Sequence, residues 1–132
     1  MSALGEWDAA EAPVDEEPAP ALYYPNVEAF VRDQLAPTYR RELDSPSRTW
    51  CPEWWRHAEA IARLEALWRA WEHLRLDPAT GISVWFRDHA DHHMGVLLDV
   101  NGPFKGCSPG KGHGARLDPL PHAAPPPGMF DH

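Results

Sequence analysis

Two stretches of this chain repeat apolar residues at intervals of three and four, and this spacing limits the possible folds more than any other feature. Such a spacing places apolar side chains along one side of an α-helix. It predicts one helix over residues 54–75 and another over residues 82–98, with a turn between them at residues 77–81. Because this connection is short, we expect antiparallel neighbours in a small all-α bundle of three or four helices.

A shorter helical pattern precedes these two segments. Asn26 is a suitable N-cap, and apolar residues then recur from Val27 to Leu35. Pro37 lacks a backbone N–H, so we expect it either to kink this helix or to start a second short helix over residues 37–43. With the two longer helices, this pattern predicts a helical domain over residues 22–104.

The two ends of the chain differ from this segment in composition. Residues 1–20 carry six acids and neither lysine nor arginine, so they account for −6 of the net charge of −8. From residue 105 onward the chain is rich in glycine and proline, which bury too little apolar area to offset the entropy of ordering. We therefore expect a disordered acidic tail over residues 1–21 and a largely disordered tail over residues 105–132.

Charge and hydropathy argue against two classes of function. Residues 22–104 contain nine arginines and no lysine against twelve acids, a net charge of −3, so nucleic-acid binding by phosphate neutralisation is not favoured. The N-terminus is acidic and no apolar run is long enough to span a bilayer, so we expect a cytoplasmic protein that does not enter membranes. The expected partner is another protein, whose identity the sequence leaves open, as it does the oligomeric state.

Three histidines lie within the apolar stripes of the two longest predicted helices. His57 belongs to the first stripe, whereas His89 and His93 lie in the middle of the second. A buried imidazole needs a hydrogen-bond partner or a metal ion. Residues four apart on a helix lie on one side of it, so His89 and His93 have the spacing of a metal-binding pair. The same spacing also suits core histidines that bond to the backbone, and both interpretations stay open.

The two cysteines extend the metal hypothesis. Two cysteines are too few for a disulfide scaffold, and in a reducing compartment they serve as buried thiols or as metal ligands. One precedes the first long helix and the other follows the second. Zinc takes four such ligands in structural sites. The candidate ligands of a mixed zinc site are His57, His89, His93, Cys51 and Cys107.

One further regularity involves the cysteines. Cys51 to His57 and Cys107 to His113 share the spacing Cys-x5-His. This spacing is not that of a recognised zinc finger, and His113 lies in a glycine-rich stretch. The regularity alone therefore predicts no particular site.

Catalysis is not favoured by the pattern. A zinc protease needs a glutamate directly after the first histidine of its pair as a general base, and Ala90 occupies that position. On a helix, Asp91 points to the face opposite His89. We therefore predict a non-catalytic protein-interaction or accessory module without a cofactor. The alternative is a domain that zinc stabilises or that depends on a metal.

Segments rich in tryptophan, arginine and histidine form a specific pattern over about residues 26–108. They are Trp50–His57, Arg63–Glu72, Trp85, Asp88–Asp91, His93, Gly102-Pro103-Phe104 and Cys107. In these segments the chain resembles an actinobacterial family of small proteins classed as a domain of unknown function, and all five candidate ligands match its motif positions. Members often accompany plasmids, integrated elements or phage-like genes, so the resemblance implies an accessory role beside mobile genetic elements. It implies no catalytic activity.

Overall fold

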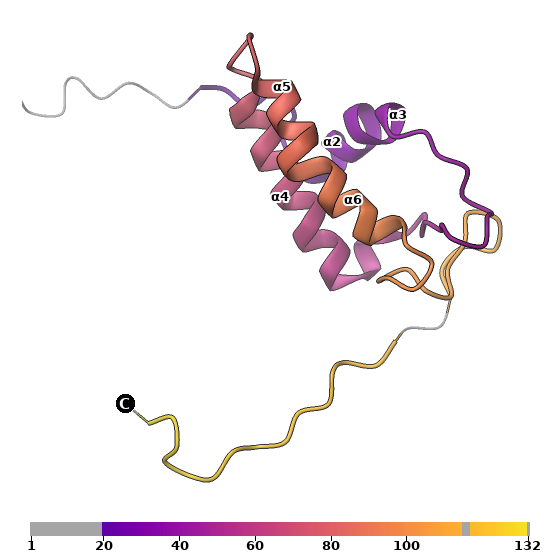
Figure 1. The fold of residues 1–132 in the computed structure, drawn as a ribbon, viewed down its shortest axis with the longest axis vertical. Coiled ribbons are helices and arrows are strands. Elements are labelled where there is room, and N and C mark those ends of the chain that lie inside the picture. The colour runs from indigo at the N-terminus through magenta and orange to yellow at the C-terminus, as the bar shows by residue number, and fades with distance from the viewer. Residues whose placement is uncertain (1–19, 115–116, 132) are drawn as a thin grey trace, which may run out of the picture.

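The computed structural model describes residues 20–114 and 117–131. Within these ranges the regular structure is helical, without a β-strand, as the apolar spacing predicts (Figure 1). The acidic residues 1–19 of the predicted N-terminal tail lie outside the described residues. No helix in the described ranges combines the length and the apolar character that crossing a membrane requires.

The longest helix is α4 (Ala58–Leu74), and it begins later than residue 54, where the sequence predicts its start. Residues Trp54–Arg56 form a separate 3-10 turn. His57 follows this turn with extended backbone angles, φ −116° and ψ 114°, and is the N-cap residue of α4. The prediction that His57 lies within the helical apolar stripe is therefore wrong, because the helix starts only after it.

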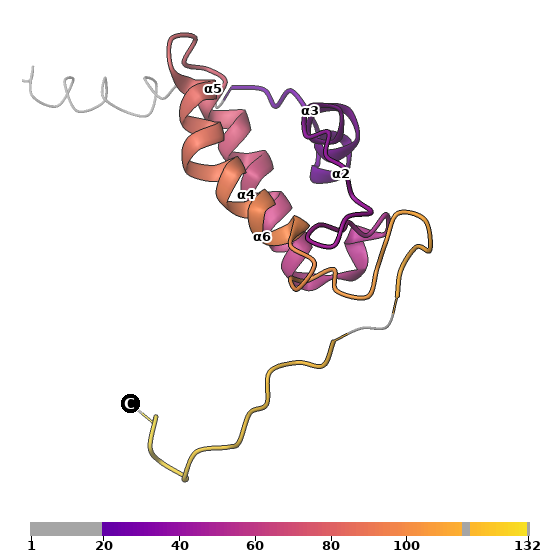
Figure 2. The same ribbon diagram turned by 45° about the vertical axis from the view of Figure 1, so that its right-hand side comes forward.

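The second long helical segment runs antiparallel to α4 (Figures 1 and 2). It consists of α5 (Gly81–Val84), a π-helical stretch over Trp85–Ala90, and α6 (Asp91–Leu98). A π-helical turn holds more residues than an α-helical one, so it rotates everything that follows it.

This rotation moves the buried face of the second segment by one residue. From the π-helical stretch onward the buried residues are Ala90, Met94, Leu97 and Leu98. The regular α-helical spacing places His89, His93, Val96 and Leu97 there instead. His89 and His93 are consequently half-buried at the margin of the core and not at its centre.

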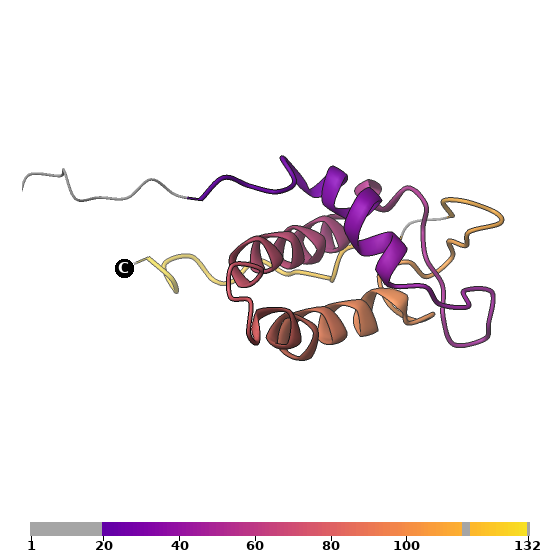
Figure 3. The same cartoon turned by 90° about the horizontal axis from the view of Figure 1, so that it is seen from above.

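A third helical segment crosses the first two (Figure 3). It consists of α2 (Val27–Phe30), a π-helical stretch over Val31–Leu35, and α3 (Ala36–Thr38). Asn26 caps it as predicted, since its side-chain oxygen accepts a hydrogen bond from the backbone N–H of Ala29 at 2.9 Å.

Of the two alternatives at Pro37, a kink or a second short helix over residues 37–43, the second is wrong, because the helical segment ends at Thr38. Side chains satisfy carbonyl groups of its last turn. The Thr38 hydroxyl donates to the Gln34 carbonyl at 2.7 Å, and the Arg40 guanidinium donates to the Pro37 carbonyl at 3.1 Å. These bonds replace the backbone N–H groups that would otherwise continue the helix.

Aromatic side chains join the three helical segments into one core. The ring of Phe30 lies 5.8 Å from that of Trp71 and 6.3 Å from that of Trp85, measured between ring centroids. Trp85 is 1% exposed, and its indole N–H donates to the Leu67 carbonyl at 3.0 Å. Large aromatic rings supply much of the apolar burial on which so small a bundle depends.

Two loops run side by side at the end of the bundle where α4 begins and α6 ends. The backbone N–H of Thr49 donates to the Leu98 carbonyl at 2.9 Å, and that of Val100 donates to the Ser47 carbonyl at 3.1 Å. The buried Thr49 hydroxyl donates to the Cys107 carbonyl at 2.6 Å. These bonds bring the chain before Cys51 next to the chain around Cys107.

Candidate metal centre

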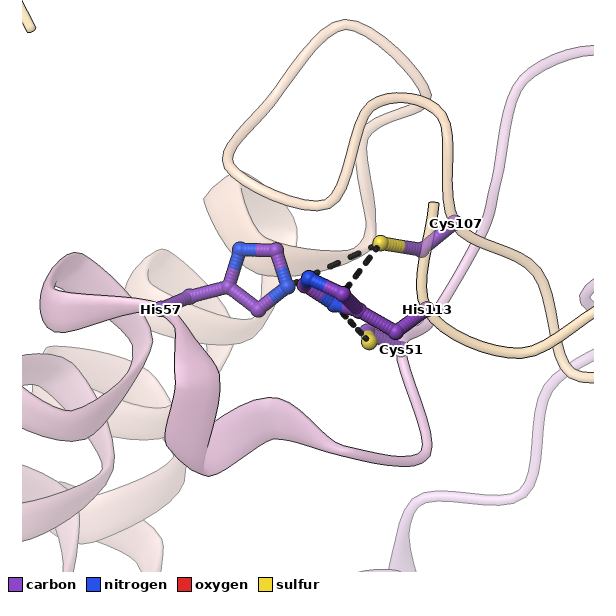
Figure 4. Close-up of side chains that lie close together, drawn as sticks. All are labelled: Cys51, His57, Cys107 and His113. Atoms are coloured by element: carbon purple, nitrogen blue, oxygen red, sulfur yellow. Dashed lines mark hydrogen bonds between the residues drawn. The ribbon is translucent and has the colours of Figure 1, made fainter. Parts of the chain in front are cut away.

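Four side chains converge where these two loops meet (Figure 4). They are Cys51, His57, Cys107 and His113, and their four potential ligand atoms all lie within 4.8 Å of one another. Both cysteines are buried, whereas the two histidines are half-buried. The group offers two sulfur and two nitrogen ligands, a combination that structural zinc sites use.

The distances between these atoms fit a tetrahedron around one ion. The Cys107 Sγ lies 3.6 Å from the His57 Nε2 and 3.7 Å from the His113 Nδ1, and the Cys51 Sγ lies 3.3 Å from the same Nδ1. With Zn–S bonds of about 2.3 Å and Zn–N bonds of about 2.0 to 2.1 Å, tetrahedral geometry separates sulfur from nitrogen by about 3.5 Å. The residues present therefore fit a zinc ion at their centre.

The first pair of ligands is positioned by the 3-10 turn between them. The backbone N–H of Arg56 donates to the Glu53 carbonyl at 3.0 Å, and that of His57 donates to the Trp54 carbonyl at 3.1 Å. The edge-to-face contact between the rings of His57 and Phe104, with centroids 4.9 Å apart, fixes the imidazole. The extended backbone at His57 thus carries its side chain away from α4 and towards the second cysteine (Figure 4).

A tight hairpin positions the second pair of ligands. Ser108 and Gly112 exchange two backbone hydrogen bonds, of 3.1 and 2.7 Å, so Cys107 and His113 flank the hairpin directly. Gly112 has a φ of +82°, which favours glycine. At Gly114, a Cβ atom would lie 1.8 Å from a backbone oxygen. In this loop the glycines therefore allow a turn and a close backbone approach that place two ligands together.

The two thiols have different surroundings. The Cys107 Sγ accepts a hydrogen bond from the backbone N–H of Gly114 at 3.3 Å. Burial and, to a smaller extent, the adjacent Cys107 raise the pKa of Cys51 to about 11. A divalent cation between the sulfurs would stabilise both thiolates and reverse this shift. A bound divalent cation would therefore balance the negative charge of the two thiolates.

The structure brings together three of the five predicted ligands, namely Cys51, His57 and Cys107. It adds His113, which the prediction left out although it ends the second Cys-x5-His segment. The occurrence of the same spacing twice was the signal that could have identified it. The 3-10 turn between Cys51 and His57 and the hairpin between Cys107 and His113 each direct a cysteine and a histidine towards the same point.

The histidine pair on the second long helical segment lies apart from this group. The His93 Nδ1 accepts a hydrogen bond from the Arg63 guanidinium of α4 at 2.9 Å. Burial and the charge of Arg63 lower the pKa of His93. His89 is half-buried and is likewise outside the group of four. His93 therefore has the hydrogen-bond partner that a half-buried imidazole needs, without a metal.

The arrangement supports a structural role for a bound metal. Four protein ligands complete a tetrahedral shell, whereas catalytic zinc sites keep a position open for water or substrate. Among the described residues no carboxylate belongs to the group of four. Zinc held here would fix the loops without activating a water molecule.

Among known proteins, the chain matches a family model and no curated protein or solved structure. The family model is described as a domain of unknown function, DUF4913, and it matches residues 24–126. This range contains the three helical segments and all four residues of the candidate metal centre. The resemblance seen in the sequence to a family classed as a domain of unknown function is thereby confirmed. The chain belongs to the DUF4913 family.

Proposed function

We propose that this protein is a small non-catalytic helical module whose loops are fixed by one zinc ion. The ion would bind Cys51, His57, Cys107 and His113. The observation that carries the proposal is the set of sulfur-to-nitrogen distances, 3.3 to 3.7 Å, which matches the edges of a tetrahedral zinc site.

Ligand type favours zinc over calcium and magnesium, and the charge of the ligands suits a divalent ion. Calcium and magnesium take oxygen ligands, and this group has none, whereas thiolate and imidazole suit zinc. Two thiolates neutralise the charge of a zinc ion, and two neutral imidazoles add none. A neutral centre costs little to bury, which suits ligands that include two buried cysteines.

The positions of the four ligands in the chain indicate which segments zinc would hold together. One pair precedes α4 and the other follows α6, so the ion would join two segments that are distant in sequence. The loop between Cys107 and His113 has no apolar side chain of its own to bury. Zinc would supply the stability that apolar contacts do not supply there.

A zinc-fixed surface of this kind suits a module that binds another protein, which is the function that the sequence favours. The interaction partner stays a prediction, as does the accessory role beside mobile genetic elements that the family resemblance implies. The two hypotheses drawn from the sequence, a zinc-stabilised domain and a protein-interaction module, are compatible, because a structural ion can shape a binding surface.

Metal analysis of the purified protein tests the proposal. We expect one zinc ion per chain after purification without chelators, and loss of most of it in Cys107→Ser and in His113→Gln. His92→Gln, a change at an exposed histidine of α6, is the matched control and should keep the full zinc content. Cobalt(II) in place of zinc should give the intense visible absorption of a tetrahedral site. Wild-type protein with far less than one metal ion per chain would refute the proposal.

A further inference from the structure

A groove that the metal centre does not use lies between the third helical segment and α6. Its apolar part has a volume of about 180 Å³, and its lining residues include Leu35, Leu43, Trp50 and Met94. The groove continues into a second hollow of about 320 Å³, since Tyr39, Met94 and Leu98 line both. Together they provide an apolar trough with a polar end.

Two arginines place positive charge at the polar end of the trough. Arg41 and Arg48 line the second hollow, and neither guanidinium forms an ion pair with a carboxylate of the described residues. Arg41 lies over the Tyr39 ring, 4.8 Å from its centroid.

Two carboxylates also line this hollow, and both already accept hydrogen bonds. Asp91 accepts one from the Tyr39 hydroxyl at 2.6 Å, and Asp99 accepts one from the backbone N–H of Asn101 at 2.8 Å. A ligand with an apolar side chain followed by a carboxylate would therefore fill the trough and pair with an arginine.

The chain carries a segment of this chemistry near its end. Met129 and Phe130 are 61% and 68% exposed, and Asp131 follows them. The backbone N–H of Met129 donates to the Pro126 carbonyl at 3.3 Å, and Gly128 has a φ of +85°, which are features of a type II turn.

The turn gives the segment part of its shape before it binds anything. The backbone N–H of Asp131 also donates to the Gly128 carbonyl at 3.4 Å. A preformed turn loses less conformational entropy on binding than a flexible segment does. Three consecutive prolines, residues 125–127, stiffen the chain that leads to it.

We propose that residues 126–131 of one copy of this chain dock into the groove of a second copy. Phe130 would enter the apolar part of the groove, and the Asp131 carboxylate would pair with Arg41 or Arg48. The same segment lies well away from α3 in Figures 1 and 2. None of its residues lines either part of the groove. Reciprocal exchange of the two segments would give a symmetric dimer.

Sedimentation velocity on the full, metal-loaded chain over a range of concentrations tests the proposal. We expect a monomer–dimer equilibrium that Phe130→Asp weakens by at least about tenfold, because burial of a phenylalanine is worth about 1.5 to 3 kcal/mol. Phe130 is exposed, so this change leaves the fold intact. Leu120→Asp, at a residue that is 91% exposed and lies outside residues 126–131, is the matched control and should dimerise like the wild type.

A mixing experiment separates the groove from the segment. Arg41→Glu with Arg48→Glu should weaken dimer formation as well, whereas a mixture of this groove variant with Phe130→Asp should form heterodimers through the one intact groove and the one intact segment. Three results would overturn the proposal: a wild-type chain that stays monomeric, a dimer that Phe130→Asp leaves unchanged, or a mixture that forms no heterodimer. A monomer whose tryptophan fluorescence is changed by Phe130→Asp would instead indicate docking within one chain.

Discussion

The helical bundle and the metal-binding loops of this protein are held together by different interactions. The bundle buries large apolar side chains such as Phe30, Leu64 and Trp85, and its three helical segments all contribute to one core. The loops at its end contribute Cys51, Phe104 and Cys107 to this core. They are joined to each other by a few backbone hydrogen bonds and by the convergence of four cysteines and histidines.

This difference implies that the stability of the bundle and the stability of the loops have different sources. The stability of the bundle grows with the apolar area that its side chains bury, so many residues contribute a little each. The stability of the loops would depend on one ion and four ligands, so that a single change removes most of it. Substitutions in the core and removal of the metal should therefore act on separate parts of the molecule.

The largest effect is expected from a change in the bundle. Trp85→Ala should lower the free energy of unfolding by about 3 to 5 kcal/mol, because it removes a fully buried aromatic side chain and the hydrogen bond from its indole to the Leu67 carbonyl. Chemical denaturation of the zinc-loaded protein measures this. Trp55, which is 54% exposed, provides the control, and Trp55→Ala should cost less than about 0.5 kcal/mol. Equal losses in the two variants would contradict the proposed core.

Removal of the metal should affect the loops and spare the bundle. After treatment with a chelator, we expect faster amide hydrogen exchange at Thr49, Val100 and Cys107, whose N–H groups are bonded within and between the loops. Helical circular dichroism should change little, since most of the core consists of side chains of the helical segments, and Cys51 and Cys107 are its only two metal ligands. Collapse of the helical signal on chelation would show instead that the bundle itself requires the ion.

A smaller effect is expected from Glu72, a buried carboxylate of α4. It accepts hydrogen bonds from the backbone N–H groups of Tyr23 and Tyr24, at 2.8 and 2.9 Å, and from the Arg75 guanidinium at 3.2 Å. Glu72→Gln removes the charge from these bonds and should destabilise the protein by about 1 to 3 kcal/mol near neutral pH.

The pH dependence of this variant follows from the direction of the shift. Burial alone would raise the pKa of Glu72, but the bonds from Tyr23, Tyr24 and Arg75 outweigh it and lower the pKa. A depressed folded pKa stabilises the protein above the unfolded value of about 4.3, and this contribution is lost as the pH falls through the folded pKa. The difference between wild type and Glu72→Gln should therefore shrink below about pH 4. A difference that stays constant down to pH 2 would contradict the role of the charge.

Apolar spacing sufficed to predict the fold class and the N-cap at Asn26, because both depend on local patterns. Apolar spacing did not correctly predict which way the side chains of His89 and His93 point. The π-helical stretch over Trp85–Ala90 adds a residue that no spacing rule anticipates, and it moves His89 and His93 out of the centre of the core. One extra residue in a helical turn is enough to bury Ala90 and Met94 at the positions where regular spacing places His89 and His93.

The metal centre was only partly predictable for a related reason. Cys51 and Cys107 follow from residue type, since few other roles suit two cysteines in such a chain. The inclusion of His113 depends on a hairpin that closes between Ser108 and Gly112, and this closure depends on contacts distant in sequence, such as the bond from Thr49 to Cys107. Glycine-rich composition alone does not distinguish such a hairpin from a flexible tail.

The smallest effect is expected from His93, one of the three histidines that the sequence makes candidates both for metal binding and for the core. His93→Ala should leave one zinc ion per chain and cost less than about 1 kcal/mol of stability, because His93 is half-buried and bonds only to Arg63 among the contacts described here. His113→Ala, a substitution of the same type at the candidate centre, should lose most of the zinc. Elemental analysis and denaturation of the two variants side by side measure both quantities. Loss of zinc in His93→Ala but not in His113→Ala would place the metal on the helix and refute the separation between bundle and loops.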